Sequence, residues 1–566
     1  MRTPAAVLLS VLAVVPLPAQ PAPPFGDRAS FETFVDGVMA GEMEAAHVPG
    51  AVVVVVRNGT VFFSKGYGYA DLEARTPVLP ERTIFRIGSI TKVFTALAVM
   101  QLADRGKLEL SDDVNRHLRT WKVPATYAQP ITIANLLTHS SGLDEISPGR
   151  KTGDPKNLIP LGEFLSTRIV RRRAPGTMIS YSTYNMALAG HVVESITGTH
   201  LRDYFAANIF TPLAMTRTTL GALPAAQRGD LATGYEFSHG RYKPLPFEYF
   251  HTYPASDINS TGADMGRFML SQLGGGALGE TRIVSEAATR QMQSRQFANH
   301  PRLIGMTYGW FENRRGGLAA IEHGGVMDGY SSLVYLAPRE NFGIYVAGTI
   351  EDSNFPIAVR NAIVGRDFHA PQTEVPAVTP PLKTRLTRFA GSYRNDIWCH
   401  SCPALSRGFL PSPAKVTANQ DGTISLWGGR WMQIEPMLFR LTSGQLDTGE
   451  TMVAFRQDGE GRITHFFNGA WSHEKVALPP AVRVPLAKLR DYAGRYELAP
   501  ERFLTVTLKG ERLVAETSGE PSAELVPLSE TEFTAVDADA RVTFSKNGLI
   551  LRYGGREMHA TKLPRE

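Results

Sequence analysis

Two apolar runs stand out in the first hundred residues. Ala51 to Val56 is almost entirely β-branched and is followed by Asn58-Gly59, a pattern typical of a buried strand that turns into a hairpin. Val93 to Ala103 is apolar on nearly every face rather than along one stripe, which is typical of a helix buried in a large core. Gly106 marks the expected end of that helix.

Along residues 26–368, the pattern of apolar and polar positions predicts mostly helices and then strands. An amphipathic helix over Ser30 to Ala46 comes first, further helical segments fill residues 131–273, and strands return between 308 and 348. A hairpin, then helices, then strands indicate an α+β domain over 26–368, preceded by the segment 1–20. We expect the early hairpin to join the same sheet as the late strands.

Beyond residue 368 the pattern changes. Residues 369–384 are rich in proline and read as a linker. Leu386-x-x-Phe389-Ala390-Gly391-Ser392-Tyr393 is then repeated as Leu489-x-x-Tyr492-Ala493-Gly494-Arg495-Tyr496, among short strands and turns. We expect two small all-β domains, 385–478 and 487–566, each closed into a barrel.

Composition narrows the function classes. The chain has 566 residues and a net charge of only +5, with no basic stripe interleaved with aromatic residues, so nucleic-acid binding is not indicated. Residues 1–20 combine Arg2, a short apolar run and a small-residue cleavage site, which predicts a signal peptide and export to the periplasm or the medium. That run is too short for a membrane-spanning helix, so we expect no stable membrane insertion.

The only two cysteines are Cys399 and Cys402. In an exported protein a local disulfide is the favoured interpretation. His400 lies between them, but no fourth ligand is evident, and the chain has no H-E-x-x-H motif. The sequence therefore predicts neither a metal site nor a cofactor.

Candidate chemistry begins at Ser89 and Lys92. They share one helical face one turn apart, at the entrance of the predicted buried helix. A lysine among apolar neighbours has its charged form disfavoured, so it can accept the serine proton. The S-x-x-K pattern also occurs at Ser412/Lys415 and Ser472/Lys475, in stretches without a following helix, where we attribute it to chance.

Two later features complete a candidate site. Tyr181 lies on a loop just ahead of a predicted helix, and His323-Gly324-Gly325 lies on a predicted strand. Without Cβ atoms, Gly324 and Gly325 would let a substrate backbone lie along that strand. The N–H groups of Ser89 and Val326 are the candidate oxyanion donors. His139, at the end of another helix, is interpreted as a packed structural histidine.

These motifs resemble the exported serine hydrolases related to class C β-lactamases and low-molecular-weight penicillin-binding proteins. The resemblance covers residues 30–350. It rests on five segments: Phe85 to Lys92, Leu136 to Leu143, Pro175-Gly176 with Tyr181-Ser182, Pro212-Leu213 and His323 to Gly325. It implies an antiparallel sheet flanked by helices with a helical subdomain. It also implies that Ser89 is acylated, that Lys92 and Tyr181 share acid/base duty, and that His323 supports substrate or oxyanion binding.

Two positions depart from the family pattern. Thr183 replaces the asparagine of Y-x-N, and His323 replaces a lysine, so carboxylate binding at neutral pH is weakened. Both changes, and the two trailing β domains, resemble the D-aminopeptidases and esterases of the family, whose layout ends in two lipocalin-like barrels. By that analogy a loop within 395–415, held by Cys399–Cys402, would shape the substrate site.

The resulting hypothesis is a serine hydrolase that forms an acyl-enzyme with a small-molecule or short-peptide substrate, D-aminopeptidase-like first, and an esterase or β-lactamase as the alternative. An α/β-hydrolase is disfavoured because the chain has no G-x-S-x-G. A different class also stays open: a non-catalytic sensor that binds cell-wall peptides. The sequence leaves the substrate, the primary base and the oligomeric state undecided.

Overall fold

The structure, a computed structural model, describes residues 26–238, 240–368, 386–402, 413–443, 451–477, 482–499, 502–517, 523–535, 540–553 and 556–564. The predicted signal peptide at 1–20 and the predicted linker at 369–384 lie outside the described residues. No helix within these ranges is long and apolar enough to cross a membrane.

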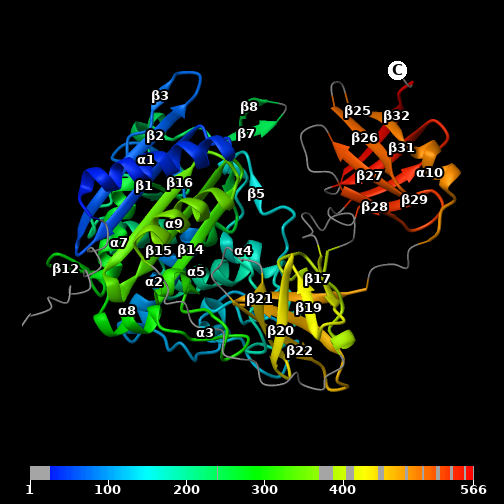
Figure 1. The fold of residues 1–566 in the computed structure, drawn as a ribbon. Helices are drawn as coiled ribbons and strands as arrows, with labels where there is room; N and C mark the ends of the chain where they lie inside the picture. The colour runs from blue at the N-terminus through cyan, green and yellow to red at the C-terminus, as the bar shows by residue number, and fades with distance from the viewer. Residues whose placement is uncertain are drawn as a thin grey trace, which may run out of the picture.

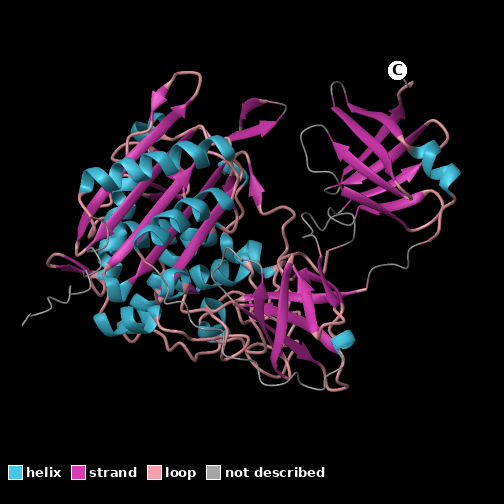
Figure 2. Cartoon of the chain, in the orientation of Figure 1, coloured by secondary structure: helices cyan, strands magenta, loops and turns pink. Residues whose placement is uncertain are grey.

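A seven-stranded antiparallel sheet forms the centre of the N-terminal domain (Figures 1 and 2). Its order is β13-β14-β15-β16-β1-β2-β3, so the early hairpin pairs with the late strands, as predicted. The strands are β1 Gly50–Arg57, β2 Thr60–Asp71, β3 Thr76–Pro77, β13 Phe311–Asn313, β14 Ala320–Met327, β15 Tyr330–Ala337 and β16 Phe342–Gly348.

The hairpin turn follows the predicted chemistry. Asn58 and Gly59 both have positive φ, at 49° and 78°. That conformation matches the twist of the flanking strands and suits this residue pair.

Helices cover both faces of the sheet, which explains the continuous apolar run in β1. Ala51, Val53 and Val55 pack on α1 and α9, whereas Val52, Val54 and Val56 belong to the core shared with α2, α5 and α7. The helices are α1 Arg28–Ala45, α2 Thr91–Asp104, α3 Ile133–Leu137, α4 Leu161–Ser166, α5 Thr183–Thr197, α6 Leu201–Phe205, α7 Gly262–Leu273, α8 Glu286–Gln293 and α9 Asn354–Asp367.

Small strand pairs hold the loops of this domain. One three-stranded sheet joins β4 Ile84–Arg86, β10 Ile258–Thr261 and β6 Thr219–Leu220. The two-stranded sheets pair β5 Lys151–Thr152 with β9 Tyr249–Phe250, β7 Tyr235–Ser238 with β8 Arg241–Pro244, and β11 Ala277–Leu278 with β12 Thr281–Arg282.

Two closed eight-stranded barrels follow, as the sequence predicted. The first contains β17 Gly391–Asn395, β18 Ala414–Ala418, β19 Thr423–Leu426, β20 Gly429–Glu435, β21 Leu438–Ser443, β22 Met452–Gln457, β23 Ile463–Asn468 and β24 Trp471–Val476. The second is preceded by α10 Leu486–Tyr492 and contains β25 Gly494–Ala499, β26 Arg502–Lys509, β27 Arg512–Thr517, β28 Ala523–Pro527, β29 Glu532–Ala535, β30 Ala540–Phe544, β31 Gly548–Tyr553 and β32 Arg556–Lys562.

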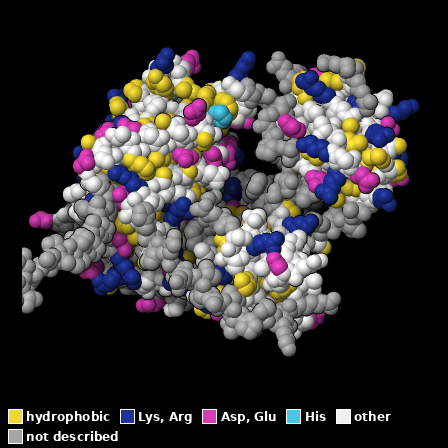
Figure 3. Space-filling model, viewed as in Figure 1, with side chains coloured by type: hydrophobic (Ala, Val, Ile, Leu, Met, Phe, Trp, Pro, Cys, Tyr) yellow, Lys and Arg dark blue, Asp and Glu magenta, His cyan; other side chains and the backbone are white. Residues whose placement is uncertain are grey.

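The repeated segment closes both barrels in the same way. Tyr393 donates a hydrogen bond to the carbonyl of Phe389, and Tyr496 donates one to the carbonyl of Tyr492. The first barrel lies against the N-terminal domain, and the second stands apart from it in Figure 1. Basic and acidic side chains are interspersed over the face in Figure 3.

The tightest contact between the sheet and the rest of the domain occurs at Gly325. A Cβ atom on Gly325 would lie 1.9 Å from the carbonyl oxygen of Ile87, which also accepts a hydrogen bond from Ser332. A Cβ atom on Gly324, in contrast, would meet only the carbonyl oxygen of Ser332, at an ordinary contact distance of 3.7 Å. Only Gly324 therefore fits the sequence interpretation of both glycines as room for a substrate, because the space beside Gly325 is filled by the chain itself.

These two glycines give a matched test. We expect Gly325→Ala to lower the free energy of unfolding by about 2–4 kcal/mol, because the methyl group must displace the backbone that leads to Ser89. Gly324→Ala is the control and should change it by less than about 1 kcal/mol. Urea denaturation of both variants measures the difference, and equal effects would contradict this account.

Candidate active site

Ser89 lies in a short 3-10 turn, Gly88–Ile90, that leads directly into α2. Gly88 has a φ of +53°, and a Cβ atom there would lie 3.0 Å from the backbone nitrogen of Val326. The turn therefore presses against β14. This arrangement brings the N–H groups of Ser89 and Val326, the predicted oxyanion donors, to neighbouring backbone positions.

Lys92 is fully buried in the first turn of α2. Its Nζ lies 2.8 Å from Ser89 Oγ and 2.9 Å from the carbonyl oxygen of Ala255. Burial lowers the pKa of Lys92 to about 7, a direction that Arg150 reinforces and Glu145 opposes. A large share of the amine is thus neutral at physiological pH and can accept a proton from Ser89.

Tyr181 immediately precedes α5, whose N-cap is Ser182. Its ring stacks on His139 at 4.4 Å between centroids, and Lys92 Nζ lies 5.1 Å from its centroid. Burial raises the pKa of Tyr181 well above its ordinary value, against a smaller opposing effect of a hydrogen bond with Ser89. The side chain is therefore a phenol that can donate a proton or relay one.

His139 is packed, as the sequence suggested, but it packs against a predicted site residue. Its Nδ1 accepts hydrogen bonds from the Ser182 N–H at 3.3 Å and the Asn185 amide at 3.0 Å. Those bonds place the ring proton on Nε2. No pattern in the sequence indicates this contact, because His139 and Tyr181 come from the ends of separate helices.

His323 lies on β14 and is buried. Its Nδ1 donates a hydrogen bond to the carbonyl of Gly324 at 2.7 Å. Burial and the proximity of Lys92 lower the pKa of His323 to about 3. The imidazole is therefore neutral at physiological pH and supplies no positive charge to a substrate carboxylate.

Thr183, the predicted substrate-binding residue, is the first residue of α5. Its hydroxyl accepts a hydrogen bond of 2.9 Å from Arg150, and its N–H donates one of 2.6 Å to Glu145. Arg150 and Glu145 were not singled out from the sequence. They come from an irregular loop whose residues show no periodic pattern.

These side chains meet around one cavity of about 850 Å³. Ser89, Tyr181, Thr183, His323, Gly324 and Val326 all line it, and Lys92 lies beneath Ser89. The first barrel supplies part of its wall: Ile397, Asn468, Ala470 and Trp471. Trp471 stacks on Phe311 at 5.1 Å and lies 5.9 Å from the ring of Tyr181.

Asp396, in the loop after β17, connects the first barrel to the segment that carries Tyr181. It accepts hydrogen bonds from Ser180 at 2.8 Å and from Arg173 at 2.9 Å, and it forms an ion pair with Arg172 at 3.1 Å. Burial opposes its charge, but His400 and Arg173 outweigh that effect and hold the pKa of Asp396 well below its usual range.

Asp396, His400 and Glu474 lie close enough together to resemble a metal site. The carboxylates are already paired with guanidinium groups, however, since Arg172 contacts both Asp396 and Glu474. We therefore interpret the cluster as an ion-pair network across the domain interface.

Cys399 and Cys402 form a disulfide, in agreement with the sequence interpretation. The N–H groups of His400 and Ser401 in this turn donate hydrogen bonds to the carboxylate of Asp144, at 3.1 and 2.8 Å. Asp144 directly precedes Glu145, so the disulfide turn braces the loop that contacts Thr183. Residues 403–412 of the predicted specificity loop lie outside the described residues.

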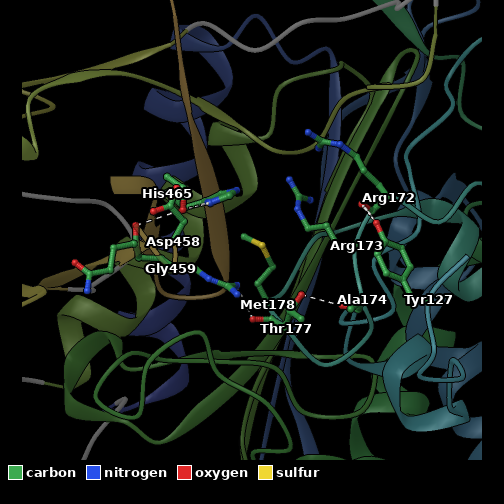
Figure 4. A pocket seen from close by; sticks show the side chains of 12 residues that line it. Tyr127, Arg172, Arg173, Ala174, Thr177, Met178, Asp458, Gly459 and His465 are labelled. Atoms are coloured by element: carbon green, nitrogen blue, oxygen red, sulfur yellow. Dashed lines mark hydrogen bonds between the residues drawn. The ribbon is translucent and has the colours of Figure 1, made fainter. Parts of the chain in front are cut away.

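A second cavity, of about 470 Å³, lies at the same domain interface (Figure 4). Arg172, Arg173 and Thr177 line it from the N-terminal domain, and the turn around Asp458 and Gly459 lines it from the first barrel. Arg456 donates a hydrogen bond to the carbonyl of Thr177 at 2.9 Å across this interface.

Comparison with known proteins agrees with the fold and with the motifs. Residues 35–365 match the family model described as Beta-lactamase. Protein flp of Staphylococcus aureus (strain N315) is 29% identical over 333 residues, which are 58% of this chain and 65% of that protein. Penicillin-binding protein 4* of Bacillus subtilis (strain 168) is 24% identical over 372 residues, 61% of this chain and 80% of that protein.

The fold also resembles a solved structure. The octameric penicillin-binding protein homologue from Pyrococcus abyssi is similar over 94% of this chain and 100% of that chain. Its TM-score is 0.52 and its sequence identity is 19%, so this likeness concerns the fold alone.

Burial of Lys92 predicts a gain in stability when the amine is removed. The folded-state pKa is about 7 and the ordinary value is 10.5. Between these pH values the unfolded chain therefore binds more protons than the folded one. The loss of folding stability caused by burying the amine is complete below about pH 7 and vanishes as the pH approaches 10.5. We expect Lys92→Met to raise the free energy of unfolding by about 2–4 kcal/mol at pH 6.5.

Urea denaturation at pH 6.5 and pH 9.5 measures that gain, which should shrink at the higher pH. Lys107→Met, at an exposed lysine, is the control and should shift stability by less than about 0.5 kcal/mol. A destabilised Lys92→Met at both pH values would contradict the assignment of a neutral buried amine.

The Asp396 network predicts that the first barrel orders the segment around Tyr181. We expect Asp396→Asn to weaken the ion pairs with Arg172 and Arg173 and to increase amide hydrogen exchange of residues 178–183 by about tenfold or more. Asp421→Asn, at an exposed ion pair with Arg430 on the same barrel, is the matched control. Unchanged exchange in Asp396→Asn would show that the segment is ordered without the barrel.

Proposed function

Because the chain belongs to the β-lactamase family, we propose that it is a serine hydrolase that cleaves an amide or ester through an acyl-enzyme on Ser89. One observation carries this proposal: a fully buried lysine, with its pKa lowered to about 7, lies 2.8 Å from the Ser89 hydroxyl oxygen. A serine beside a neutral amine is an activated nucleophile.

Acylation proceeds in two steps. Ser89 Oγ forms a bond to the substrate carbonyl carbon while its proton passes to the neutral amine of Lys92, and the carbonyl electrons move onto oxygen. The N–H groups of Ser89 and Val326 stabilise that oxyanion. The tetrahedral intermediate then collapses, the bond to the leaving group breaks, and the proton held by Lys92 reaches the leaving amine or alkoxide through the Tyr181 hydroxyl.

Deacylation uses the same groups in reverse. Water gives a proton to neutral Lys92 as its oxygen attacks the acyl carbon, and the C–Oγ bond breaks as Ser89 recovers a proton. Lys92 is thus the primary base, because Tyr181, whose pKa is raised, remains protonated. His323 is neutral, so it lines the cavity and can form hydrogen bonds, but it contributes no positive charge.

Among substrates of this reaction, we place short peptides with a D-residue first and esters second. The support is the pair of departures at Thr183 and His323, which removes the amide and the cation that a β-lactam would use. The two barrels after the catalytic domain match the D-aminopeptidase layout in the same way. The chain spans about 65% of the length of Protein flp, whose name specifies no activity.

The test is hydrolysis by purified protein of D-alanyl and L-alanyl p-nitroanilide, short-chain p-nitrophenyl esters and a chromogenic cephalosporin. We expect turnover of at least one amide or ester, a loss of about 10³-fold or more in Ser89→Ala, and a preference for the D-anilide over the L-anilide. The rate should fall with an apparent pKa of about 7 as Lys92 becomes protonated at lower pH.

Turnover that survives in Ser89→Ala would exclude this mechanism. Absence of turnover with every substrate, together with ligand binding that is intact in Ser89→Ala, would instead support the cell-wall-peptide sensor. A rate that is independent of pH between 5 and 9 would remove Lys92 as the base.

A further inference from the structure

Arg150 is placed firmly beside the catalytic groups. Its carbonyl accepts a hydrogen bond from the His251 N–H at 2.8 Å, and the next residue begins β5. Its side chain is 24% exposed and lines the same cavity as Ser89. The backbone anchor and the partial exposure together give a guanidinium that is fixed in place and accessible to a substrate.

Glu145, the acidic partner of Arg150, also lines the cavity, but both of its carboxylate oxygens are engaged by neighbouring groups. One carboxylate oxygen is bound to Arg150, and the other accepts the hydrogen bond from the Thr183 N–H at 2.6 Å. The Glu145 side chain is nearly buried. Its role is to hold Arg150 and Thr183 together, so it does not offer a free negative charge to an incoming ammonium group.

The surface that Arg150 and Thr183 present consists of donors. Arg150 Nη1 is used by Glu145 and Thr183, and its Nε is buried without a partner. Nη2 makes no hydrogen bond within the described part of the chain, so it is the guanidinium donor left for a substrate. The Thr183 oxygen already accepts the bond from Arg150, which leaves its hydroxyl proton free to donate. An asparagine at 183 would also have offered an acceptor, which this pair lacks.

The charge of Arg150 reaches the catalytic groups. It lowers the pKa of both Lys92 and Tyr181, in each case as a smaller effect than burial and than the opposing effect of Glu145. Like Arg150, the other two cations that line the cavity have carboxylate partners: Lys151 is paired with Glu248 and Asp328, and Arg360 with Glu322. Arg150 is the cation of the three whose charge acts on both Lys92 and Tyr181, which places it near the bound substrate.

We infer that Arg150 and Thr183 form a subsite for an oxygen acceptor in the acyl part of the substrate, a carboxylate above all. Guanidinium groups bind carboxylates strongly, in charge-assisted hydrogen bonds. A free α-ammonium in the same place would meet the like charge of Arg150, and the Glu145 carboxylate there is already paired with Arg150 and Thr183. This inference rests on the proposed acyl-enzyme chemistry on Ser89. It departs from the aminopeptidase layout, because it selects N-acylated substrates over those with a free amino terminus.

Three matched anilides test the subsite: N-succinyl-, N-acetyl- and unblocked alanine p-nitroanilide, with alanine in the enantiomer that the wild type prefers. They place a carboxylate, a carbonyl or an ammonium at the acyl end. We expect kcat/KM to fall in that order, with about tenfold or more between the first and the last. Arg150→Met should reduce the succinyl-to-unblocked ratio by about tenfold or more, and Arg150→Lys by less.

Two further variants serve as controls for this comparison. Glu145→Gln/Arg150→Met removes both charges, so it avoids leaving a buried unpaired carboxylate, and it should show the same loss of selectivity. Arg290→Met, at an exposed arginine on α8, should leave all three rates unchanged. Two outcomes would overturn the subsite. One is an equal loss of rate on all three anilides in Arg150→Met. The other is a faster rate on the unblocked anilide that depends on Glu351, a cavity carboxylate near Asp328.

Binding to an inactive protein separates this inference from the proposed function. N-succinyl-alanine should bind Ser89→Ala about tenfold or more tightly than N-acetyl-alanine in isothermal titration calorimetry, and Arg150→Met in that background should abolish the difference. If no anilide is hydrolysed but this difference holds, the proposed function fails and the subsite stands. Equal affinities would overturn the subsite whatever the catalytic result.

Discussion

The structure depends on the burial of one amine. Lys92 is fully buried, which lowers its pKa to about 7, so a large share of the amine is uncharged near neutral pH. The surrounding elements are arranged to tolerate it: the Ala255 carbonyl accepts from Nζ, the adjacent Pro254 carbonyl accepts from Thr95, and Thr91 accepts from the Ile258 N–H. These bonds fasten α2 to the loop that precedes β10 and fix the angle at which Ser89 meets β14.

A second constraint comes from the first barrel. The wall opposite α2 is incomplete without Trp471, and the backbone before Tyr181 is bonded to the barrel through Ser180–Asp396 and through Ser472, which donates to the Ile179 carbonyl. The barrel therefore contributes contacts to the segment before Tyr181 as well as part of the cavity wall.

Sequence patterns predicted what depends on short separations. Local geometry explains the Asn58-Gly59 hairpin, the buried helix after Ser89 and the one-turn spacing of Ser89 and Lys92. The repeated Gly-x-Tyr segments indicated the two barrels. Contacts between distant segments could not be predicted. Arg150 reaches Thr183 across 33 positions, and Asp396 reaches Arg173 across 223. Ser472, in an S-x-x-K attributed to chance, has an interface role that no pattern in the sequence marks.

Uncharged and charged groups occupy different parts of the site. Near pH 7 the groups closest to the reacting carbonyl are largely uncharged: Lys92 is substantially neutral, His323 is neutral and Tyr181 is protonated. A centre of this kind stabilises the developing oxyanion through oriented N–H groups and does little to sort substrates by charge. Sorting by charge must then come from the rim, where Arg150 keeps its Nη2 donor while both oxygens of Glu145 are engaged by neighbours. Thr183 belongs to that arrangement, since its hydroxyl accepts a hydrogen bond from Arg150.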